Sequence, residues 1–170
     1  IDFGLARKLD SREGKTYTLV GTAQFMAPEV ALGKGFSTFA DTWALGVCAF
    51  EFMIGRLPFG EDTDNQLEIF REILRKEPKM PRWLHEDARD LMLRMMRKKP
   101  EERIGSGRRA YQDVKEHPFF SEFNFGEAIS MAIVAPYVPP PQDEEAFKNL
   151  ERVRLKPLVY DIKDDWAADF

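Results

Sequence analysis

The sequence has few of the residues that form disulfides and metal clusters. Cys48 is the only cysteine, and there are two histidines in 170 residues. A lone cysteine cannot form a disulfide within the chain, and these few residues leave no Cys/His metal cluster. No apolar run approaches the roughly 20 residues that a membrane-spanning helix needs, and no charged-then-apolar leader follows Ile1. We therefore expect no membrane span, no signal peptide and a reducing, cytoplasmic compartment.

An excess of positive charge is also missing. The net charge is −4, and residues 121–170 carry 10 acids and 5 bases, whereas residues 1–120 carry 19 and 20. Neither part has the basic patch expected of a nucleic-acid binder, so nucleic acid is not an expected partner. The acidic part also contains a proline cluster within residues 136–141. We predict a domain over residues 1–120 and an extension over residues 121–170.

Apolar patterning predicts a mainly α-helical body. Thr38–Ile54 is apolar on nearly every side and stops at Gly55, which predicts a buried central helix. Residues 1–35 are rich in glycine, hydroxyl and charged residues, and we expect strand and loop there.

Three further helices are expected. The stretch Thr63–Arg75 starts with a capping-box match of Thr63 and Gln66. Residues 88–96 place apolar side chains at helical spacing, and we expect the bases at 97–99 in the last turn of that helix. Residues 110–116 predict a short fourth helix.

Four motifs follow one another in a family-specific order. Asp2-Phe3-Gly4 is followed 23 residues later by Ala27-Pro28-Glu29, a spacing typical of a kinase activation segment. Asp41 to Val47 and Pro100 to Arg103 come next. On these motifs the chain resembles the eukaryotic protein kinase family. The resemblance implies that residues 1–120 form the helical C-lobe of a kinase, and it extends more loosely to the remaining residues.

The first motif carries the metal chemistry of the family. Phosphoryl transfer from ATP needs Mg²⁺ to neutralise phosphate charge, and a hard cation prefers oxygen ligands. The resemblance implies that Asp2 supplies a carboxylate to the metal. It also implies that Phe3 packs between the kinase lobes and that Gly4 lets the backbone turn.

The residues from Lys15 to Thr22 resemble the activation loop of cAMP- and cGMP-dependent kinases. The resemblance implies that Thr18 is phosphorylated and that Arg7 pairs with the phosphate. Thr16 and Tyr17 are weaker candidates for phosphorylation. A plain solvated loop hydroxyl at Thr18 is the alternative.

The same resemblance implies a surface that binds protein substrates. The implied substrate-binding residues are Leu19, Thr22, Ala23, Met26 and Glu51. Thr22 supports specificity for serine and threonine. Ala23 and Gln24 depart from the usual proline and glutamate. Glu51 lies between two phenylalanines, where a carboxylate is seldom left unpaired, and we expect it either to receive an arginine of a basic substrate or to form a structural ion pair.

Three charged residues have implied structural roles. Glu29 and Arg103 correspond to a buried ion pair that fastens the activation segment to the helical lobe. Asp41 has two interpretations: with Thr38 it has the spacing of a capping box, and in the family it binds the backbone of the catalytic loop.

The end of the chain resembles the extension of AGC-group kinases, most closely that of cGMP-dependent kinases. Phe123-Asn124-Phe125, the proline cluster and the ending Asp165 to Phe170 carry this resemblance. It implies that Trp166 and Phe170 fill an apolar pocket of the N-lobe. A disordered acidic tail is the alternative.

The family's phosphate loop, ATP-binding lysine and His-Arg-Asp loop are not found in the sequence. We therefore predict no catalytic residue within this chain and no activity of the chain alone, with the catalytic base lying upstream. The expected parent is a basophilic, cyclic-nucleotide-dependent Ser/Thr kinase that uses ATP and Mg²⁺. Its expected partners are its own N-lobe, basic protein substrates and upstream cGMP-binding domains. The alternative is a non-catalytic binding module; a pseudokinase is disfavoured because Asp2 and Gly4 are intact.

Overall fold

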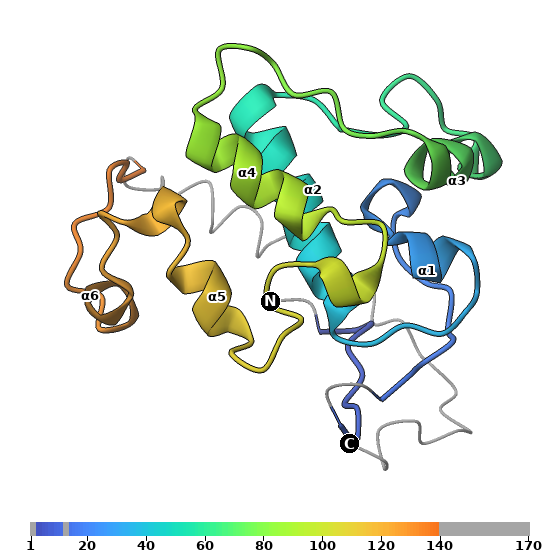
Figure 1. The fold of residues 1–170 in the computed structure, drawn as a ribbon, viewed down its shortest axis with the longest axis horizontal. Coiled ribbons are helices and arrows are strands. Elements are labelled where there is room, and N and C mark those ends of the chain that lie inside the picture. Colours follow the sequence, from blue (N-terminus) through green and yellow to red (C-terminus); the bar gives the residue numbers. More distant parts are fainter. Residues whose placement is uncertain (1–2, 12–13, 140–170) are drawn as a thin grey trace, which may run out of the picture. The chain divides into compact units, whose positions relative to one another are not determined.

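The fold is helical, as the apolar patterning predicted. The computed structural model describes residues 3–11 and 14–139 (Figure 1). Within these residues there is no strand, and the expected strand near the amino terminus reduces to one isolated antiparallel bridge between Thr16 and Phe36. No described helix is long and apolar enough to cross a membrane. The predicted residues Trp166 and Phe170 lie outside the described part of the chain.

The chain divides into two compact units, Ile1–Phe125 and Gly126–Phe170. This division lies five residues beyond the predicted boundary, which stays a prediction. The elements in chain order are η1 (Ala23–Phe25), α1 (Pro28–Ala31), α2 (Phe39–Ile54), α3 (Gln66–Arg75), α4 (Glu86–Met95), η2 (Pro100–Glu102), α5 (Tyr111–Lys115), η3 (Pro118–Phe120) and α6 (Phe125–Ile129).

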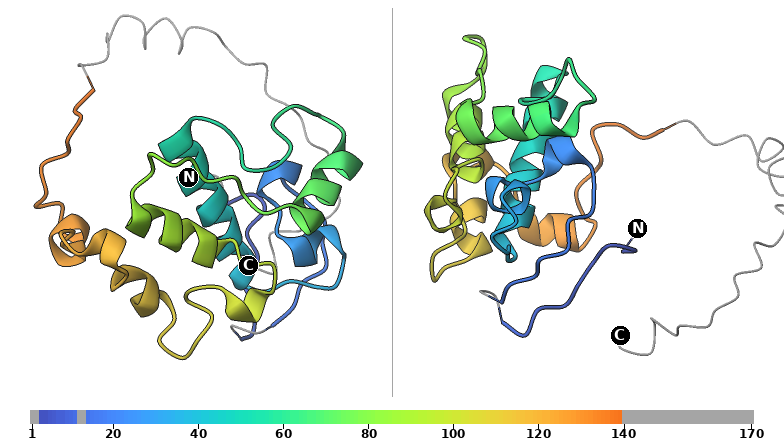
Figure 2. Two further views of the ribbon diagram at one scale, coloured as in Figure 1. Left: turned by 45° about the horizontal axis from the view of Figure 1, so that its top comes forward. Right: turned by 90° about the vertical axis from the view of Figure 1, so that its right-hand side faces the viewer.

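Helices α2 and α4 lie side by side at the centre of the first unit (Figures 1 and 2). They come together at Gly46, where an added Cβ would lie 2.8 Å from Cβ of Met95 and 2.9 Å from Cγ of Met96. A side chain of any size at position 46 would therefore hold the two helices apart. Helix α2 ends at Gly55, whose φ of 81° suits glycine.

Helix α2 is not buried on every side, which corrects the prediction of a fully buried helix. Trp43, Val47 and Phe50 are buried, whereas Leu45 is 53% exposed and Phe52 is 86% exposed. The apolar composition predicted burial all round, but no described residue covers this side of the helix.

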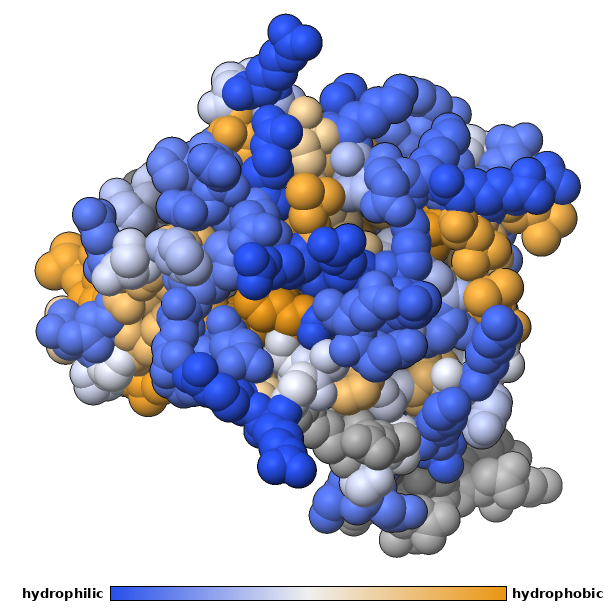
Figure 3. Space-filling view, viewed as in Figure 1, coloured by the Kyte–Doolittle hydropathy of each residue, from blue (hydrophilic) through white to orange (hydrophobic). Residues whose placement is uncertain are grey.

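The N-cap of helix α3 lies two residues later than the capping-box match predicted. The residue at its N-cap is Asn65, whose side-chain oxygen accepts a hydrogen bond from the amide of Leu67. The Thr63 hydroxyl instead accepts from the amide of Asn65 and donates to Glu68. The helix buries Ile69 and Ile73 in the core, while its outer face keeps apolar residues in solvent. Figure 3 shows apolar side chains where α3 lies, and Leu67 is 67% exposed.

Helix α4 buries its predicted apolar stripe. The five apolar residues at helical spacing are all buried: Ala88, Leu91, Met92, Met95 and Met96. The bases at 97–99, however, lie beyond the end of the helix at Met95 and not in its last turn. That expectation was wrong because the chain leaves the helix at Met96, before the bases.

Candidate functional site

The amino-terminal segment presents its aromatic residue to solvent. Phe3 is 79% exposed, and its carbonyl oxygen accepts a hydrogen bond from the amide of Ala6 at 2.9 Å. Asp2, the predicted metal ligand, lies outside the described residues. Within residues 3–11 and 14–139 there is no group of three or more side chains able to hold a metal ion.

The predicted activation loop is anchored at Thr16. Its amide and carbonyl exchange two 2.9 Å hydrogen bonds with Phe36, and its hydroxyl accepts a long hydrogen bond of 3.5 Å from Arg7. Thr16 is only 8% exposed, whereas Thr18 is exposed. Thr18 is therefore more accessible to a modifying enzyme than Thr16. The predicted phosphate partner, Arg7, hydrogen-bonds Thr16 and not Thr18.

Tyr17 lies between these two threonines and is 68% exposed. Its ring lies close to Gly35, where an added Cβ would come within 2.6 Å of the ring edge. Gly35 also has a φ of 76°. The backbone at Gly35 thus leaves room for the ring only because no side chain is present there.

The predicted substrate-binding residues run from solvent into the core. Leu19 is 52% exposed and Met26 is 7% exposed, with the exposed Thr22 and the half-buried Ala23 between them. Met26 belongs to the same apolar core as Ile69 of α3. Helix α3 contacts both η1 and α1, so it packs against the segment that carries these residues.

Glu51 has no hydrogen bond or ion pair to any other described side chain, which leaves its carboxylate available. The structural ion pair that was the alternative for this residue is not formed within the described part of the chain. Burial, followed by the negative charge of Glu51, raises the pKa of the neighbouring Cys48 thiol.

Glu29 and Arg103 form a buried, bidentate ion pair. Nη1 of Arg103 lies 2.7 Å from Oε1 of Glu29, and Nη2 lies 2.6 Å from Oε2. The Arg103 side chain is 0% exposed and that of Glu29 is 10% exposed. Two parallel charge-assisted hydrogen bonds fix both side chains in one orientation. The pair joins α1 to the turn after η2, 74 residues later.

The remaining donors of Arg103 are also used. Nη1 donates to the carbonyl oxygen of Phe39 at 2.8 Å, and Nε donates to that of Arg97 at 2.9 Å. Nη2 makes a longer bond of 3.4 Å to the carbonyl of Lys98. One guanidinium therefore connects α1, the start of α2 and the segment after α4, which matches the five donors that arginine offers.

Asp41, in the first turn of α2, has a side chain with no hydrogen-bonding partner among the described residues. It is exposed as a residue, yet partial burial of its carboxyl group raises the pKa. The capping-box interpretation is not seen, because the side chain of Thr38 makes no capping hydrogen bond to α2. Asp41, Leu45, Cys48 and Phe52 follow one another at helical spacing along one side of α2.

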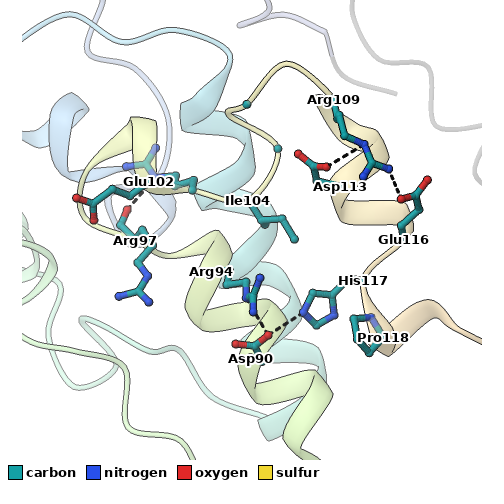
Figure 4. Close-up of a pocket in the computed structure, with 13 residues that line it drawn as sticks. Asp90, Arg94, Arg97, Glu102, Ile104, Arg109, Asp113, Glu116, His117 and Pro118 are labelled. Carbon is teal, nitrogen blue, oxygen red and sulfur yellow. Dashed lines mark hydrogen bonds and ion pairs between the residues drawn. The ribbon is translucent and has the colours of Figure 1, made fainter.

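A polar cavity of about 590 Å³ lies between α4 and α5 (Figure 4). In its lining, Nε2 of the buried His117 lies 3.0 Å from Oδ2 of Asp90, which also forms an ion pair with Arg94. Partial burial raises the pKa of Asp90, but the hydrogen bonds from His117 and Arg94 outweigh it and lower the pKa overall. Of the predicted site residues that the structure describes, Arg103 alone lines this cavity, so the cavity is separate from the predicted substrate surface.

Lys98 makes polar contacts that were not predicted from the sequence. Its Nζ donates to the carbonyl oxygens of Ile73 at 2.7 Å and Lys76 at 2.6 Å, and it lies over the rings of Trp43 and Phe59. Burial lowers the pKa of this ammonium group. The run Arg97-Lys98-Lys99 was the available signal, but it pointed equally well to the end of α4.

The family profile described as the protein kinase domain matches residues 1–120. The whole chain is 42% identical to the cGMP-dependent protein kinase of Toxoplasma gondii, of which it covers 17%. The corresponding kinase of Eimeria tenella is 49% identical over 82% of the chain, which covers 14% of that protein. The protein kinase C-like 1 of Candida albicans is 34% identical over 89% of the chain, again 14% of the relative. The chain thus spans less than a fifth of the length of each of these three relatives.

Proposed function

The chain belongs to the protein kinase family, and from this membership we propose that it forms the activation segment and substrate-binding lobe of a Ser/Thr protein kinase. In this proposal the parent protein transfers the γ-phosphate of ATP to serine or threonine side chains of protein substrates. The chain contributes the surface that receives the protein substrate, and residues elsewhere in the parent contribute the catalytic base.

One observation carries this proposal: the segment from Thr16 to Ala31 is fixed at both ends, and its middle is exposed. The bridge from Thr16 to Phe36 holds the beginning, and the ion pair of Glu29 with Arg103 holds the end. Between them Leu19 and Thr22 face solvent. A segment held in this way presents a preformed edge to an extended peptide, which reduces the entropy lost on binding.

The exposed side of α2 supports the proposal that further kinase residues pack here. Leu45 and Phe52 expose large apolar surfaces along one stripe. Asp41 lies at the start of this stripe, and its carboxylate has no hydrogen-bonding partner in residues 3–11 and 14–139. Exposed apolar stripes on a helix usually mark a surface that another element covers. We propose that the preceding part of the parent's catalytic domain covers it, with Asp41 accepting hydrogen bonds from its backbone.

Protein kinases use ATP and Mg²⁺, and the metal neutralises phosphate charge during transfer. We propose Asp2 as one oxygen ligand of the metal. A single carboxylate fits the way Mg²⁺ is bound, because this ion takes few protein ligands and completes its shell with water and phosphate oxygens.

The proposed substrates are basic. Glu51 offers an acidic side chain with no partner among the described residues, and arginine forms bidentate bonds with such a carboxylate. The 42% identity to a cGMP-dependent kinase over the whole chain supports cyclic-nucleotide control of the parent, through domains outside this chain. The proposed phosphorylation site of the activation loop is Thr18.

The test is a phosphorylation assay with the complete parent protein and [γ-³²P]ATP. Its substrates are a serine peptide with arginines before the serine and the same peptide with norleucine at those positions. We expect kcat/KM for the basic peptide to be at least about tenfold higher than for the norleucine peptide, which is the effect of losing one charged hydrogen bond. Thr18→Ala should reduce the rate, while the matched control Ser121→Ala, an exposed hydroxyl outside the segment, should not.

The competing function is a non-catalytic module that binds substrates or regulators through the helical lobe. It predicts peptide binding without phosphate transfer by the complete parent. That result would refute the kinase proposal, and equal rates for Thr18→Ala and the wild type would refute Thr18 as the control site.

A further inference from the structure

The carboxyl end of α3 is held by a lysine that is distant in the sequence. A helix leaves its last carbonyl oxygens without internal partners, and Lys98 satisfies those of Ile73 and Lys76 across 25 and 22 residues. A cation is the favoured partner at this end because the helix dipole is negative there. Lys98 therefore acts as a C-terminal cap supplied from outside the helix.

Two aromatic rings fix the direction of the Lys98 side chain. Its Nζ lies 4.5 Å from the centre of the Phe59 ring and 5.1 Å from that of Trp43, and these rings stack on each other at 5.8 Å. A cation within about 6 Å of an aromatic ring is attracted to its face. The ammonium group is thus confined between the core of α2 and the end of α3.

The backbone of Lys98 is held as well. Its carbonyl oxygen accepts the bond from Nη2 of Arg103, the same atom that pairs with Glu29. Lys98, which anchors α3, and Arg103, which anchors α1, therefore belong to one short segment of the chain after α4.

Helix α3 passes this constraint on to the substrate surface. It contacts η1 and α1, and its buried Ile69 and Ile73 belong to the core cluster that includes Met26. Ala23 packs against the same cluster, so a small shift of α3 would change the packing of both Ala23 and Met26. Such shifts of groups that do not touch the reacting atoms can still lower the efficiency of an enzyme strongly.

We propose that Lys98 is a positioning residue for substrate binding: it locks α3 against α2 and thereby fixes the positions of the proposed substrate-binding residues Ala23 and Met26. The proposal rests on the substrate-binding role proposed above. In this proposal Lys98 acts through α3 and does not itself contact the substrate or the metal.

The test compares three variants of the complete parent protein. Lys98→Met keeps the aliphatic stem and removes the charge and donors. Lys98→Arg keeps a cation with several donors. Lys99→Met is the matched control, since Lys99 forms only an exposed pair with Glu102, with side chains 67% and 49% exposed.

The first measurement is hydrogen exchange in peptides that cover α3. For Lys98→Met we expect about tenfold faster exchange at the end of the helix, the effect of losing one charged hydrogen bond. Lys98→Arg should restore most of the protection, and Lys99→Met should match the wild type.

The second measurement is the dissociation constant of the basic peptide by fluorescence anisotropy, together with KM and kcat. We expect Lys98→Met to weaken binding and raise the peptide KM at least about threefold, with kcat and the KM for ATP within about twofold. Faster exchange with unchanged peptide affinity would overturn the positioning role and leave a purely structural one. If the parent transfers no phosphate but binds the peptide, and Lys98→Met weakens that binding, this proposal is supported while the kinase function is refuted. A wild-type parent that binds no peptide would overturn both.

Discussion

Replacing Arg103 by methionine should loosen the activation segment more than any surface substitution. The change leaves the Glu29 carboxylate, 10% exposed, without its cation. It also frees the carbonyl oxygens of Phe39 and Arg97, which Arg103 now binds. Removing one partner of a buried ion pair costs about 3–5 kcal/mol, mainly because a buried charge is left unpaired.

The expected magnitude can be read as a change in hydrogen exchange. Because about 1.4 kcal/mol corresponds to a factor of ten, a loss of about 3–5 kcal/mol speeds exchange by a factor of about 10² to 10³·⁵. The relevant amides are those of Val30 and Leu32, which donate to the carbonyl oxygens of Ala27, the N-cap of α1, and Pro28, its first residue. Exchange of the peptide covering residues 23–34, measured by mass spectrometry in the complete parent protein, reports this change.

The control is the exposed pair of Lys99 with Glu102. Lys99→Met removes an ion pair of similar length, 2.7 Å, in solvent, and such exposed pairs contribute little to stability. Arg103→Lys keeps the charge but loses the bidentate geometry, so its effect should be intermediate. The reasoning is refuted if Arg103→Met leaves exchange of residues 23–34 as slow as Lys99→Met does.

Two further predictions concern the packing of α3 and α2. Glu72 accepts a hydrogen bond from the amide of Gly60, and this bond, followed by that from Lys76, lowers the pKa of Glu72 below its ordinary value of 4.5. Its contribution to stability is therefore present above about pH 4.5 and is lost as the pH falls through the lowered folded-state pKa. In Glu72→Gln, the protection of α3 amides from hydrogen exchange should fall less steeply as the pH is lowered than in the wild type. The measurement is the exchange rate, corrected for its intrinsic dependence on pH. Equal slopes for the variant and the wild type would contradict the prediction. Gly46→Ala gains about 0.5–1 kcal/mol of helix propensity but forces a methyl group against Met95, which costs about 1–3 kcal/mol; we expect faster exchange in α2 and α4, whereas slower exchange would show that the helices separate without cost.

Local patterns predicted most of the helical body. The buried stripe from Ala88 to Met96 has the 3.6-residue period of a helix, and the structure buries all five of its apolar members. The family membership was predicted from motifs and is confirmed by the profile match over residues 1–120. These features depend on residues close in sequence or on the spacing of motifs, which a single sequence contains.

What could not be predicted depends on contacts between distant residues. Thr63 and Asn65 are both good helix caps, and the capping-box spacing favoured Thr63, whereas the side chain of Asn65 caps the helix. The bases after α4 suited the dipole of their own helix, yet Lys98 binds the end of α3 instead. Likewise the apolar composition of α2 did not reveal that Leu45 and Phe52 face away from every described element.

Trp43 explains how the two anchors of the proposed substrate surface are joined. Cζ of Arg103 lies 5.3 Å from the centre of its ring and Nζ of Lys98 lies 5.1 Å from it. The ring is 0% exposed, and its Nε1 has no hydrogen-bonding partner among the described residues. Leaving a buried donor unpaired costs about 1–3 kcal/mol, and two cation–π contacts of about 0.5–2 kcal/mol each offset that cost. The anchors of α1 and α3 therefore share one ring of α2, so a change at either anchor should reach the other through Trp43.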